Sequence, residues 1–266
     1  MMHWRNAMTS RYQTLENFLL ANRLTHEGLL RLDYGGQTAA NVVIKGRKIQ
    51  AAILFVDIAN FSGQTEDLDP LETVLFVNLF IDWMTALGIR DRACIVDKYI
   101  GDEIMVVFSD EFGSKDPFLD AVNAATDMAS DDWLHFRPHF GVANGEVLVA
   151  ATGTGPRFDV SVFGSPVTRA ARCAGFESGS HAHYEVSFPA DCWGTRSLHD
   201  LDFKSSDGWE LTQPVEFDKA KNLRPFKVQQ VRYDGELLQI ADPRQIVQEA
   251  KASYEAGRRD VEVDER

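Results

Sequence analysis

The sequence AAILFVD at residues 51–57, followed directly by IANFSG at 58–63, is the stretch from which the fold can be inferred. The nearly unbroken apolar run favours a short strand that is buried on both faces of a sheet. It ends on an acid, Asp57, and the segment that follows is typical of a tight passage from a strand into a helix. A central strand that carries one carboxylate to its end is therefore expected.

Further strands are indicated by short β-rich runs between turn residues. Residues 94–108 contain two strand-like runs that meet at Gly101–Asp102, which predicts a β-hairpin. Residues 139–153 show two runs around Asn144–Gly145, a strong hairpin turn signal. The remaining expected strands are 159–164, 185–188 and 225–233.

Helices are indicated by capping residues and by apolar spacing. Asp69–Pro70 predicts the start of a helix that runs to about Leu87. Because this helix is apolar nearly all round, it is expected to be buried. Residues 9–30 predict an amphipathic helix that opens on a capping box of Ser10 and Gln13. Three further helices are expected after Asp116–Pro117, over 165–176 and after Asp242–Pro243.

Alternating strands and helices with tight hairpins predict one α+β domain at about residues 45–233. Residues 1–44 are expected to form an N-terminal helical segment and connector, and residues 234–266 a C-terminal helix with a charged tail.

Composition narrows the class of protein. The chain has 266 residues, and 27 basic against 40 acidic side chains give a net charge of −13, which disfavours a nucleic-acid partner. No apolar run approaches the length of a membrane span and no signal peptide is evident, so a cytoplasmic protein without a membrane partner is expected. Three scattered cysteines exclude a disulfide framework and are expected to be buried.

Two acids, Asp57 and Asp102, follow or interrupt apolar strands. At a strand end and a hairpin turn on neighbouring strands, their carboxylates would come together, and they would repel each other unless a cation lay between them. Oxygen ligands without nearby His or Cys favour Mg²⁺ or Mn²⁺ over zinc. The alternative, that each is an ordinary turn or cap residue, stays open at this point.

Two further segments suit a phosphate group. The backbone N–H groups of the IANFSG passage, at Asn60, Phe61 and Ser62, could hold phosphate oxygens, although a loop with a core phenylalanine explains it equally. Arg169 and Arg172 lie three residues apart on one helix face, where they could form an arginine fork; a solvated surface pair is the alternative.

Four motifs in register resemble the class III nucleotidyl cyclase catalytic domain over about residues 50–232. They are AAILFVDIANFSG (51–63), VDKYIGDEIMVVF (96–108), FGVANGEVLVAATG (140–153) and FDVSVFGSPVTRAARCAG (158–175). A closing segment, KAKNLRPFKVQQV (219–231), is similar to the family's lysine-containing loop and strand. The resemblance implies a ferredoxin-like, palm-type α+β fold with a mostly antiparallel sheet.

The resemblance also implies roles. Asp57 and Asp102, with the main-chain carbonyl of Ile58, would hold two Mg²⁺ or Mn²⁺ ions, and Arg172 would stabilise the transition state. Lys219, or failing that Lys221, would hold the terminal phosphates. The family's active sites are shared between two chains, so a homodimer is expected.

The base-facing positions depart from the family pattern. Lys98 matches the base-facing lysine of adenylyl cyclases, but Ser161 replaces its aspartate partner and Thr168 replaces the ribose-positioning asparagine. By the same resemblance GTP is disfavoured, because Lys98 stands where guanylyl cyclases carry a glutamate. A lysine only donates hydrogen bonds, which suits uracil O4 or adenine N1 and suits the amino group of cytosine poorly, so UTP and ATP remain. Tyr99 would stack in a pyrimidine pocket or, alternatively, pack at the subunit interface.

The short ends and the lack of a sensor domain look like the pyrimidine cyclases of Pycsar antiphage systems, which implies UTP as substrate and cyclic UMP as a signal to a separate effector protein. The alternatives are an adenylate cyclase and a non-catalytic nucleotide-binding module. A diguanylate cyclase is disfavoured because IGDEI (100–104) lacks that family's first glycine.

Overall fold

The computed structural model describes residues 10–24, 46–132, 134, 136–154, 157–176, 184–202, 208–217, 225–233 and 242–264. The strands are β1 (Gly46–Ile58), β2 (Cys94–Ile100), β3 (Glu103–Ser109), β4 (Pro138–Thr154), β5 (Arg157–Phe163), β6 (Tyr184–Pro189), β7 (Trp209–Leu211), β8 (Val215–Phe217) and β9 (Phe226–Tyr233). The α-helices are α1 (Leu15–Ala21), α3 (Phe61–Thr65), α4 (Pro70–Met84), α5 (Pro117–Ser130), α6 (Ser165–Ala174), α7 (Ala190–Trp193) and α8 (Pro243–Asp264). Shorter helical turns are η2 (Thr85–Ile89), η3 (Asp110–Phe112) and η4 (Leu198–Asp200).

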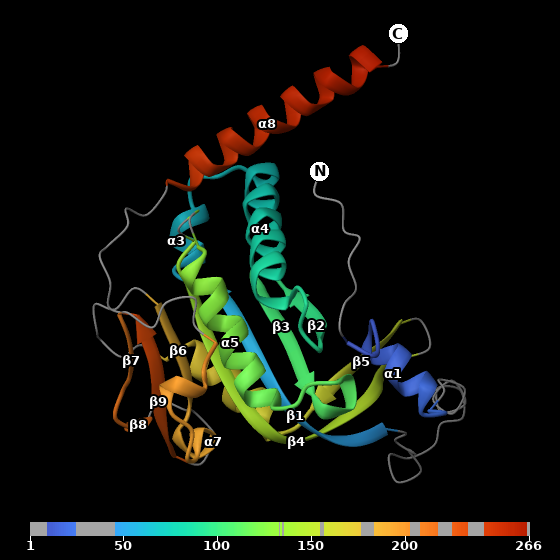
Figure 1. The fold of residues 1–266 in the computed structure, drawn as a ribbon. Coiled ribbons are helices and arrows are strands. Elements are labelled where there is room, and N and C mark those ends of the chain that lie inside the picture. The colour runs from blue at the N-terminus through green and yellow to red at the C-terminus, as the bar shows by residue number, and fades with distance from the viewer. Residues whose placement is uncertain are drawn as a thin grey trace.

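One mixed sheet organises the described part of the chain (Figure 1). Its strand order is β2-β3-β1-β4-β6-β9-β7, with β5 paired to β4 and β8 paired to β9. Every pair is antiparallel except β4 with β6, which is parallel. The expected α+β fold with a mostly antiparallel sheet is therefore confirmed.

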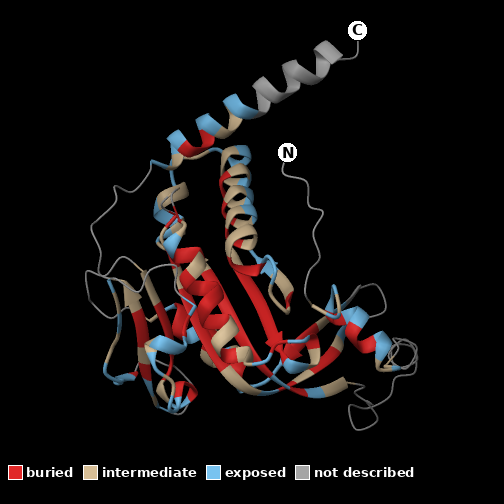
Figure 2. Cartoon of the chain, viewed as in Figure 1, coloured by how far each residue is buried: buried red, intermediate tan, exposed pale blue. Residues whose placement is uncertain are grey.

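Strand β1 lies inside the sheet, where it is hydrogen-bonded to β3 on one side and to β4 on the other. Its residues 51–56 are all buried, as expected for a strand covered on both faces. Figure 2 shows the buried residues continuing from this strand along β3, β4 and the inner side of α5. The three cysteines are buried and unpaired, as expected.

The expected hairpin at Asn144–Gly145 is wrong. Both residues lie inside the continuous strand β4, where Asn144 pairs with Ala52 and Gly145 with Ala51. The long edge of β1 supplies hydrogen-bond partners on both sides of this dipeptide, so pairing outweighs the local turn preference. The hairpin at Gly101–Asp102 does form, between β2 and β3, and Gly101 has a φ of 66° there.

Helix α4 begins as expected, with Asp69 and Glu72 in a reciprocal capping box. It is not buried all round: Phe76, Phe80 and Met84 are buried, and Phe76 and Phe80 contact the ring of Phe136. The 20 residues Pro70–Ile89 have a mean hydropathy of 1.4 and could cross a membrane by length and composition. The expectation that no apolar run reaches that length is therefore wrong.

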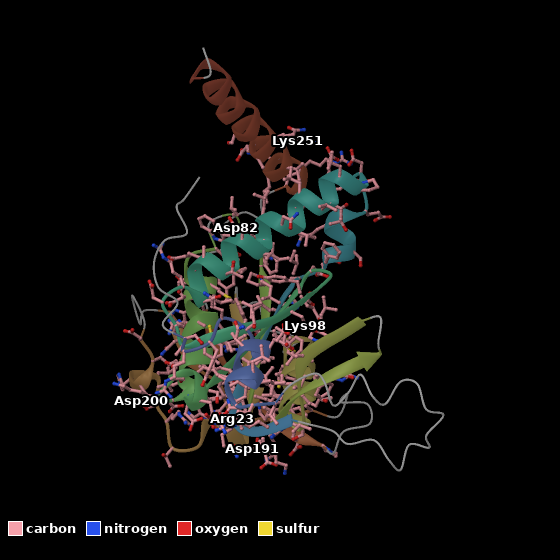
Figure 3. The ribbon with its side chains drawn as sticks, turned by 90° about the vertical axis from the view of Figure 1, so that its right-hand side faces the viewer. Arg23, Asp82, Lys98, Asp191, Asp200 and Lys251 are labelled. Atoms are coloured by element: carbon pink, nitrogen blue, oxygen red, sulfur yellow. The ribbon has the colours of Figure 1, made fainter. Side chains whose placement is uncertain are left out.

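The two helical ends of the chain pack on different parts of the domain. Helix α1 is capped by Thr14, which accepts from the N–H of Asn17, so the expected capping box at Ser10 and Gln13 does not form. Its Phe18 packs edge-on against Phe112. At the other end, α8 packs on α4, and Lys251, labelled in Figure 3, donates to Glu72 at 2.9 Å.

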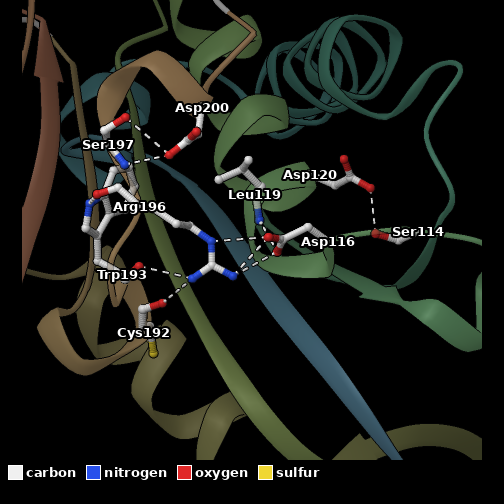
Figure 4. A network of polar contacts seen from close by, with 9 residues as sticks. All are labelled: Ser114, Asp116, Leu119, Asp120, Cys192, Trp193, Arg196, Ser197 and Asp200. Carbon is white, nitrogen blue, oxygen red and sulfur yellow. Dashed lines mark hydrogen bonds and ion pairs between the residues drawn. The ribbon is translucent and has the colours of Figure 1, made fainter.

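A polar network ties the segment after α7 to the start of α5 (Figure 4). The Arg196 guanidinium pairs with the Asp116 carboxylate at 2.9 Å and donates to the carbonyls of Cys192 and Trp193. Asp116 also caps α5 by accepting from the N–H of Leu119. One carboxylate therefore fixes both the start of a core helix and the segment that follows β6.

Helix α6 packs very closely on β4 at Gly141. A Cβ added there would lie 2.0 Å from the carbonyl oxygen of Ala170 and 2.2 Å from the N atom of Ala174. These are backbone atoms, so a side chain at 141 would have to displace α6.

We predict that Gly141→Ala lowers the free energy of unfolding by about 1–3 kcal/mol or more, because it overpacks the contact between β4 and α6. The matched control is Gly175→Ala, whose Cβ would meet the Arg172 carbonyl oxygen at 3.9 Å, an ordinary contact. The control is expected to stay within about 0.5 kcal/mol of the parent. Urea denaturation followed by circular dichroism measures both, and equal midpoints for the two variants would contradict the prediction.

Candidate active site

The sheet brings Asp57 and Asp102 together. Val56 pairs with Ile104 across β1 and β3, so the end of β1 lies beside the turn of the β2–β3 hairpin. The carboxyl groups of Asp57 and Asp102 share a hydrogen bond. This is the juxtaposition that the sequence predicts.

The pKa of Asp57 is raised from the usual 3.8 to about 7. Burial is the largest cause, followed by the hydrogen bond and the negative charge of Asp102 and by the charge of Glu103, while the N–H of Ile58 acts in the opposite direction. Burial and Asp102 also raise the pKa of Glu103. The negative charge of Asp102 thus opposes the ionisation of both of its acidic neighbours, Asp57 and Glu103.

The donor set of this acidic pair fits a hard cation. No described basic side chain pairs with Asp57, Asp102 or Glu103. In the described part of the chain, no three His, Cys, Asp or Glu side chains group closely enough to hold a metal ion by themselves. Two carboxylates with a main-chain carbonyl are nevertheless a usual protein contribution to Mg²⁺, which takes its other ligands from water and substrate phosphates.

The passage after Asp57 turns sharply into the short helix α3. Asn60 precedes that helix with a φ of 53°, in the left-handed region, and its carbonyl oxygen accepts from the N–H of Gln64. Phe61 is partly buried against the core, while Ser62 is exposed. The core phenylalanine and the exposed polar turn are thus both present, so the two sequence interpretations of this passage are compatible.

A second polar cluster joins β2 to β5. The Lys98 ammonium, labelled in Figure 3, lies 3.2 Å from an oxygen of Asp159 and 3.8 Å from Oδ2 of Asp97. The Ser161 hydroxyl donates to the same Oδ2 at 2.6 Å. The base-facing candidates Lys98 and Ser161 therefore do lie together, and Asp97 connects them.

Sequence reasoning missed Asp97. It lies in the VDKYIGDE motif directly before Lys98, and its side chain is fully enclosed. The sequence does contain a sign of it, because Asp97 directly follows the apolar residues that begin the strand. Burying a charged side chain in such a strand costs free energy unless the charge has a partner.

Helix α6 presents Thr168 and Arg172 to solvent. Arg169 does not join Arg172: its guanidinium pairs with Asp191 and lies over the ring of Phe226, 5.1 Å from the centroid. The two arginines therefore do not form a fork, because Arg169 is held against β9 and α7. Arg172 makes no ion pair with any residue that the structure describes.

The remaining candidates are Tyr99 and the two lysines Lys219 and Lys221. Tyr99 is 50% exposed, and its pKa is raised by partial burial and by the charge of Asp82 on α4. Half of the side chain is thus free to contact a nucleobase or a second subunit, the two roles that the sequence suggests. Lys219 and Lys221 lie outside the described residues.

Sequence comparison gives partial matches. No protein-family profile matches the chain. A protein from Anabaena cylindrica named adenylate cyclase is 31% identical over 137 residues, which are 46% of this chain and 26% of that protein. An uncharacterised protein from Mycobacterium tuberculosis is 26% identical over 130 residues, or 48% of this chain and 24% of that protein. The chain thus spans about a quarter of the length of the curated relatives it matches.

Solved structures match more of the chain. The adenylyl cyclase CyaB from P. aeruginosa has a TM-score of 0.57 at 19% identity and covers 73% of this chain and 100% of its own. The guanylyl cyclase Cya2 has a TM-score of 0.56 at 20% identity and covers 74% of this chain and 98% of its own. A guanylate cyclase domain from Catenaria anguillulae, solved with GTP, has a TM-score of 0.55 at 17% identity over 71% of this chain and 100% of its own. The chain therefore has the fold of class III adenylyl and guanylyl cyclase domains.

Proposed function

We propose that this protein is a nucleotidyl cyclase, which converts a nucleoside triphosphate into a 3′,5′-cyclic monophosphate and pyrophosphate. The observation that carries the proposal is the hydrogen-bonded pair of Asp57 and Asp102 at the end of β1, with the pKa of Asp57 raised to about 7. Perturbed acids at such a position are typical of functional sites, and the cyclase fold supplies the reaction class.

In the proposed reaction, the ribose 3′-hydroxyl loses its proton to solvent and its oxygen forms a bond to the α-phosphorus, while the bond from that phosphorus to the leaving pyrophosphate breaks. Bound Mg²⁺ or Mn²⁺ would supply the lowered pKa of the 3′-hydroxyl and the neutralisation of the triphosphate. Asp57, Asp102 and the carbonyl of Ile58 would hold these ions. Arg172 would meet the charge that grows on the α-phosphoryl group.

The remaining candidates would hold the rest of the nucleotide. The turn at Asn60, Phe61 and Ser62 would lie against the phosphates, as would Lys219, and Thr168 would face the ribose. Each assignment rests on the position of the residue within the motifs that resemble the family.

We propose UTP as the substrate and cyclic UMP as a signal to a separate effector in antiphage defence. Lys98 offers only donors, which suits uracil O4. ATP is the alternative, since adenine N1 is also an acceptor and the Anabaena cylindrica relative is named adenylate cyclase. Lys98 is held beside Asp97 and Asp159 and can keep a fixed position for either base.

We propose that the active form is a homodimer with shared active sites. Within one chain, no hydrogen bond or ion pair among the described residues joins the Asp57–Asp102 pair to the Lys98 cluster. Large apolar side chains are also exposed on α4 and at the end of β2: Leu71 is 70%, Val74 56%, Tyr99 50% and Ile100 47% exposed. Such surfaces commonly mark protein interfaces.

The test is a mixture of ATP, GTP, CTP and UTP with Mn²⁺, analysed by mass spectrometry. Cyclic UMP and pyrophosphate are expected. If cyclic AMP is the main product, the protein is an adenylate cyclase and the proposal of UTP is wrong. If no nucleotide gives a cyclic product, the proposal of an enzyme is wrong and the nucleotide-binding module takes its place.

Asp57→Ala and Asp102→Ala are each predicted to lower kcat by about 100-fold or more, because one of two paired carboxylate ligands is lost. The control is Glu146→Ala, an exposed acid whose ion pair with Lys48 is worth less than about 1 kcal/mol. Steady-state cyclisation assays measure all three variants, and gel filtration checks that the assembly is unchanged. Turnover near the parent level in either aspartate variant would remove the carboxylate pair from the mechanism.

The pH dependence of stability is a separate prediction. The folded chain keeps the Asp57 proton up to about pH 7, whereas the unfolded chain loses it near the usual 3.8. Without divalent ions, the free energy of unfolding should therefore fall as the pH rises between these values. Thermal unfolding in EDTA should show Asp57→Asn with a higher Tm than the parent at pH 8, and with little difference at pH 4. Mn²⁺ should raise the Tm of the parent more than that of the variant at pH 8; equal shifts would contradict a role of Asp57 in cation binding.

Arg172→Ala is predicted to lower kcat about 100-fold with KM changed only a few-fold, because its charge meets the transition state and not the bound substrate. Arg90→Ala, which removes another exposed arginine, is the control and should behave as the parent. Initial-rate kinetics separate kcat from KM. A raised KM with unchanged kcat would assign Arg172 to substrate binding instead.

A further inference from the structure

A cleft of about 460 Å³ lies between the N-terminal helix α1 and the strands β2 and β5. Two acids belong to its lining on the strand side, and the first turn of α1 lines the other side. The lining residues are Thr14, Leu15, Glu16, Val96, Asp97, Asp159 and Val160. It is separate from the Asp57–Asp102 pair and adjoins the Lys98 cluster.

Asp97, on the wall of this cleft, has an unpaired oxygen. Its side chain is 0% exposed, and its Oδ2 accepts from Ser161 at 2.6 Å. Its Oδ1 is the one buried side-chain oxygen or nitrogen, among the residues described, that has no hydrogen-bond partner. Burial raises the pKa of this carboxyl group, against the effects of Ser161 and Lys98. A buried acceptor without a donor is costly, so its retention calls for an explanation.

A β-bulge sets the direction of Asp97. Val96 pairs with Val106 of β3 and Lys98 with Met105, so Asp97 is an extra residue without a partner in the ladder. Bulges of this kind redirect side chains next to binding sites. Because of it, Asp97 and Lys98 are consecutive in sequence and yet both reach β5, through Ser161 and Asp159 respectively. An acceptor and a donor thus stand side by side.

We infer that Asp97 is a specificity-determining residue whose free Oδ1 accepts a hydrogen bond from the nucleobase, beside Lys98, which donates to it. The inference rests on the proposed nucleotidyl cyclase function. Ser161 is then a positioning residue that holds the other oxygen of Asp97. It also explains why an aspartate would be unfavourable at 161: a second carboxylate would stand within hydrogen-bond distance of Asp97, and the two would repel each other.

Asp97 and Lys98 together would recognise a base edge on which a hydrogen-bond donor lies next to an acceptor. In uracil, N3–H would donate to Asp97 and O4 would accept from Lys98. The same pair would meet the amino group and the adjacent ring nitrogen of adenine or cytosine. The inference therefore concerns the donor on the base, and it can be tested whichever nucleotide the protein prefers.

The experiment compares each triphosphate with an analogue that lacks this donor: 3-methyluridine triphosphate for UTP, purine riboside triphosphate for ATP and zebularine triphosphate for CTP. In the parent, the analogue of the preferred nucleotide should lose about tenfold or more in kcat/KM. In Asp97→Ala that loss should shrink to less than about threefold, because the partner of the donor is gone. Calorimetric binding of the same nucleotides with Ca²⁺ gives a readout besides turnover.

Stability measurements guard against a variant that simply misfolds. Asp97→Asn keeps the shape of the side chain and removes a buried charge, so its Tm at pH 7.5 should equal or exceed that of the parent while the discrimination against the analogue falls. The matched control is Asp127→Asn, which removes a carboxylate paired with Arg92 on another face. It should lower the Tm and leave the analogue discrimination unchanged.

The outcomes separate the inference from the function on which it rests. A parent protein that cyclises a nucleotide, with an analogue penalty that Asp97→Ala and Asp97→Asn leave intact, overturns the inference alone. A parent that neither binds nor cyclises any triphosphate overturns the proposed function, and the role of Asp97 with it. An analogue penalty that disappears in both Asp97 variants, while Asp127→Asn retains it, supports the inference.

Discussion

Mutual repulsion between the carboxylates of Asp57 and Asp102 is the constraint on which the proposed site depends. Strand β1 is buried on both faces and bonded on both edges, so Asp57 cannot withdraw from the hairpin turn beside it. The two groups share a hydrogen bond, and the pKa of Asp57 rises to about 7. A rigid scaffold that holds two acidic groups together loses stability, and in the proposed function a bound cation would recover that loss.

The β2–β3 hairpin contributes to both polar clusters. Its turn supplies Asp102 to the acidic pair, and the bulge before it directs Asp97 and Lys98 toward β5. In the proposed dimer, one hairpin would therefore provide a metal ligand to one active site and base-reading groups to the other.

Large apolar side chains are exposed on α4, at Leu71 and Val74, and at the end of β2 in this hairpin, at Tyr99 and Ile100. Helix α8 contacts α4 through Lys251 and Glu72, so the C-terminal helix rests on the same region. Helix α4 thus buries one stripe of side chains in the core and leaves other side chains available for contact with another surface.

The sequence alone determined the buried strand that ends at Asp57, the hairpin at Gly101, the caps of α4 and α5 and the meeting of the two acids, because each depends on local patterns and on pairing between neighbouring strands. Tertiary structure alone decided that Asn144–Gly145 stays within a strand, that Arg169 is held by Asp191 and Phe226, and that Asp97 is enclosed with one oxygen unpaired. These outcomes depend on partners that lie far away in the chain. Local preference is worth about 1 kcal/mol or less, and such distant contacts outweigh it.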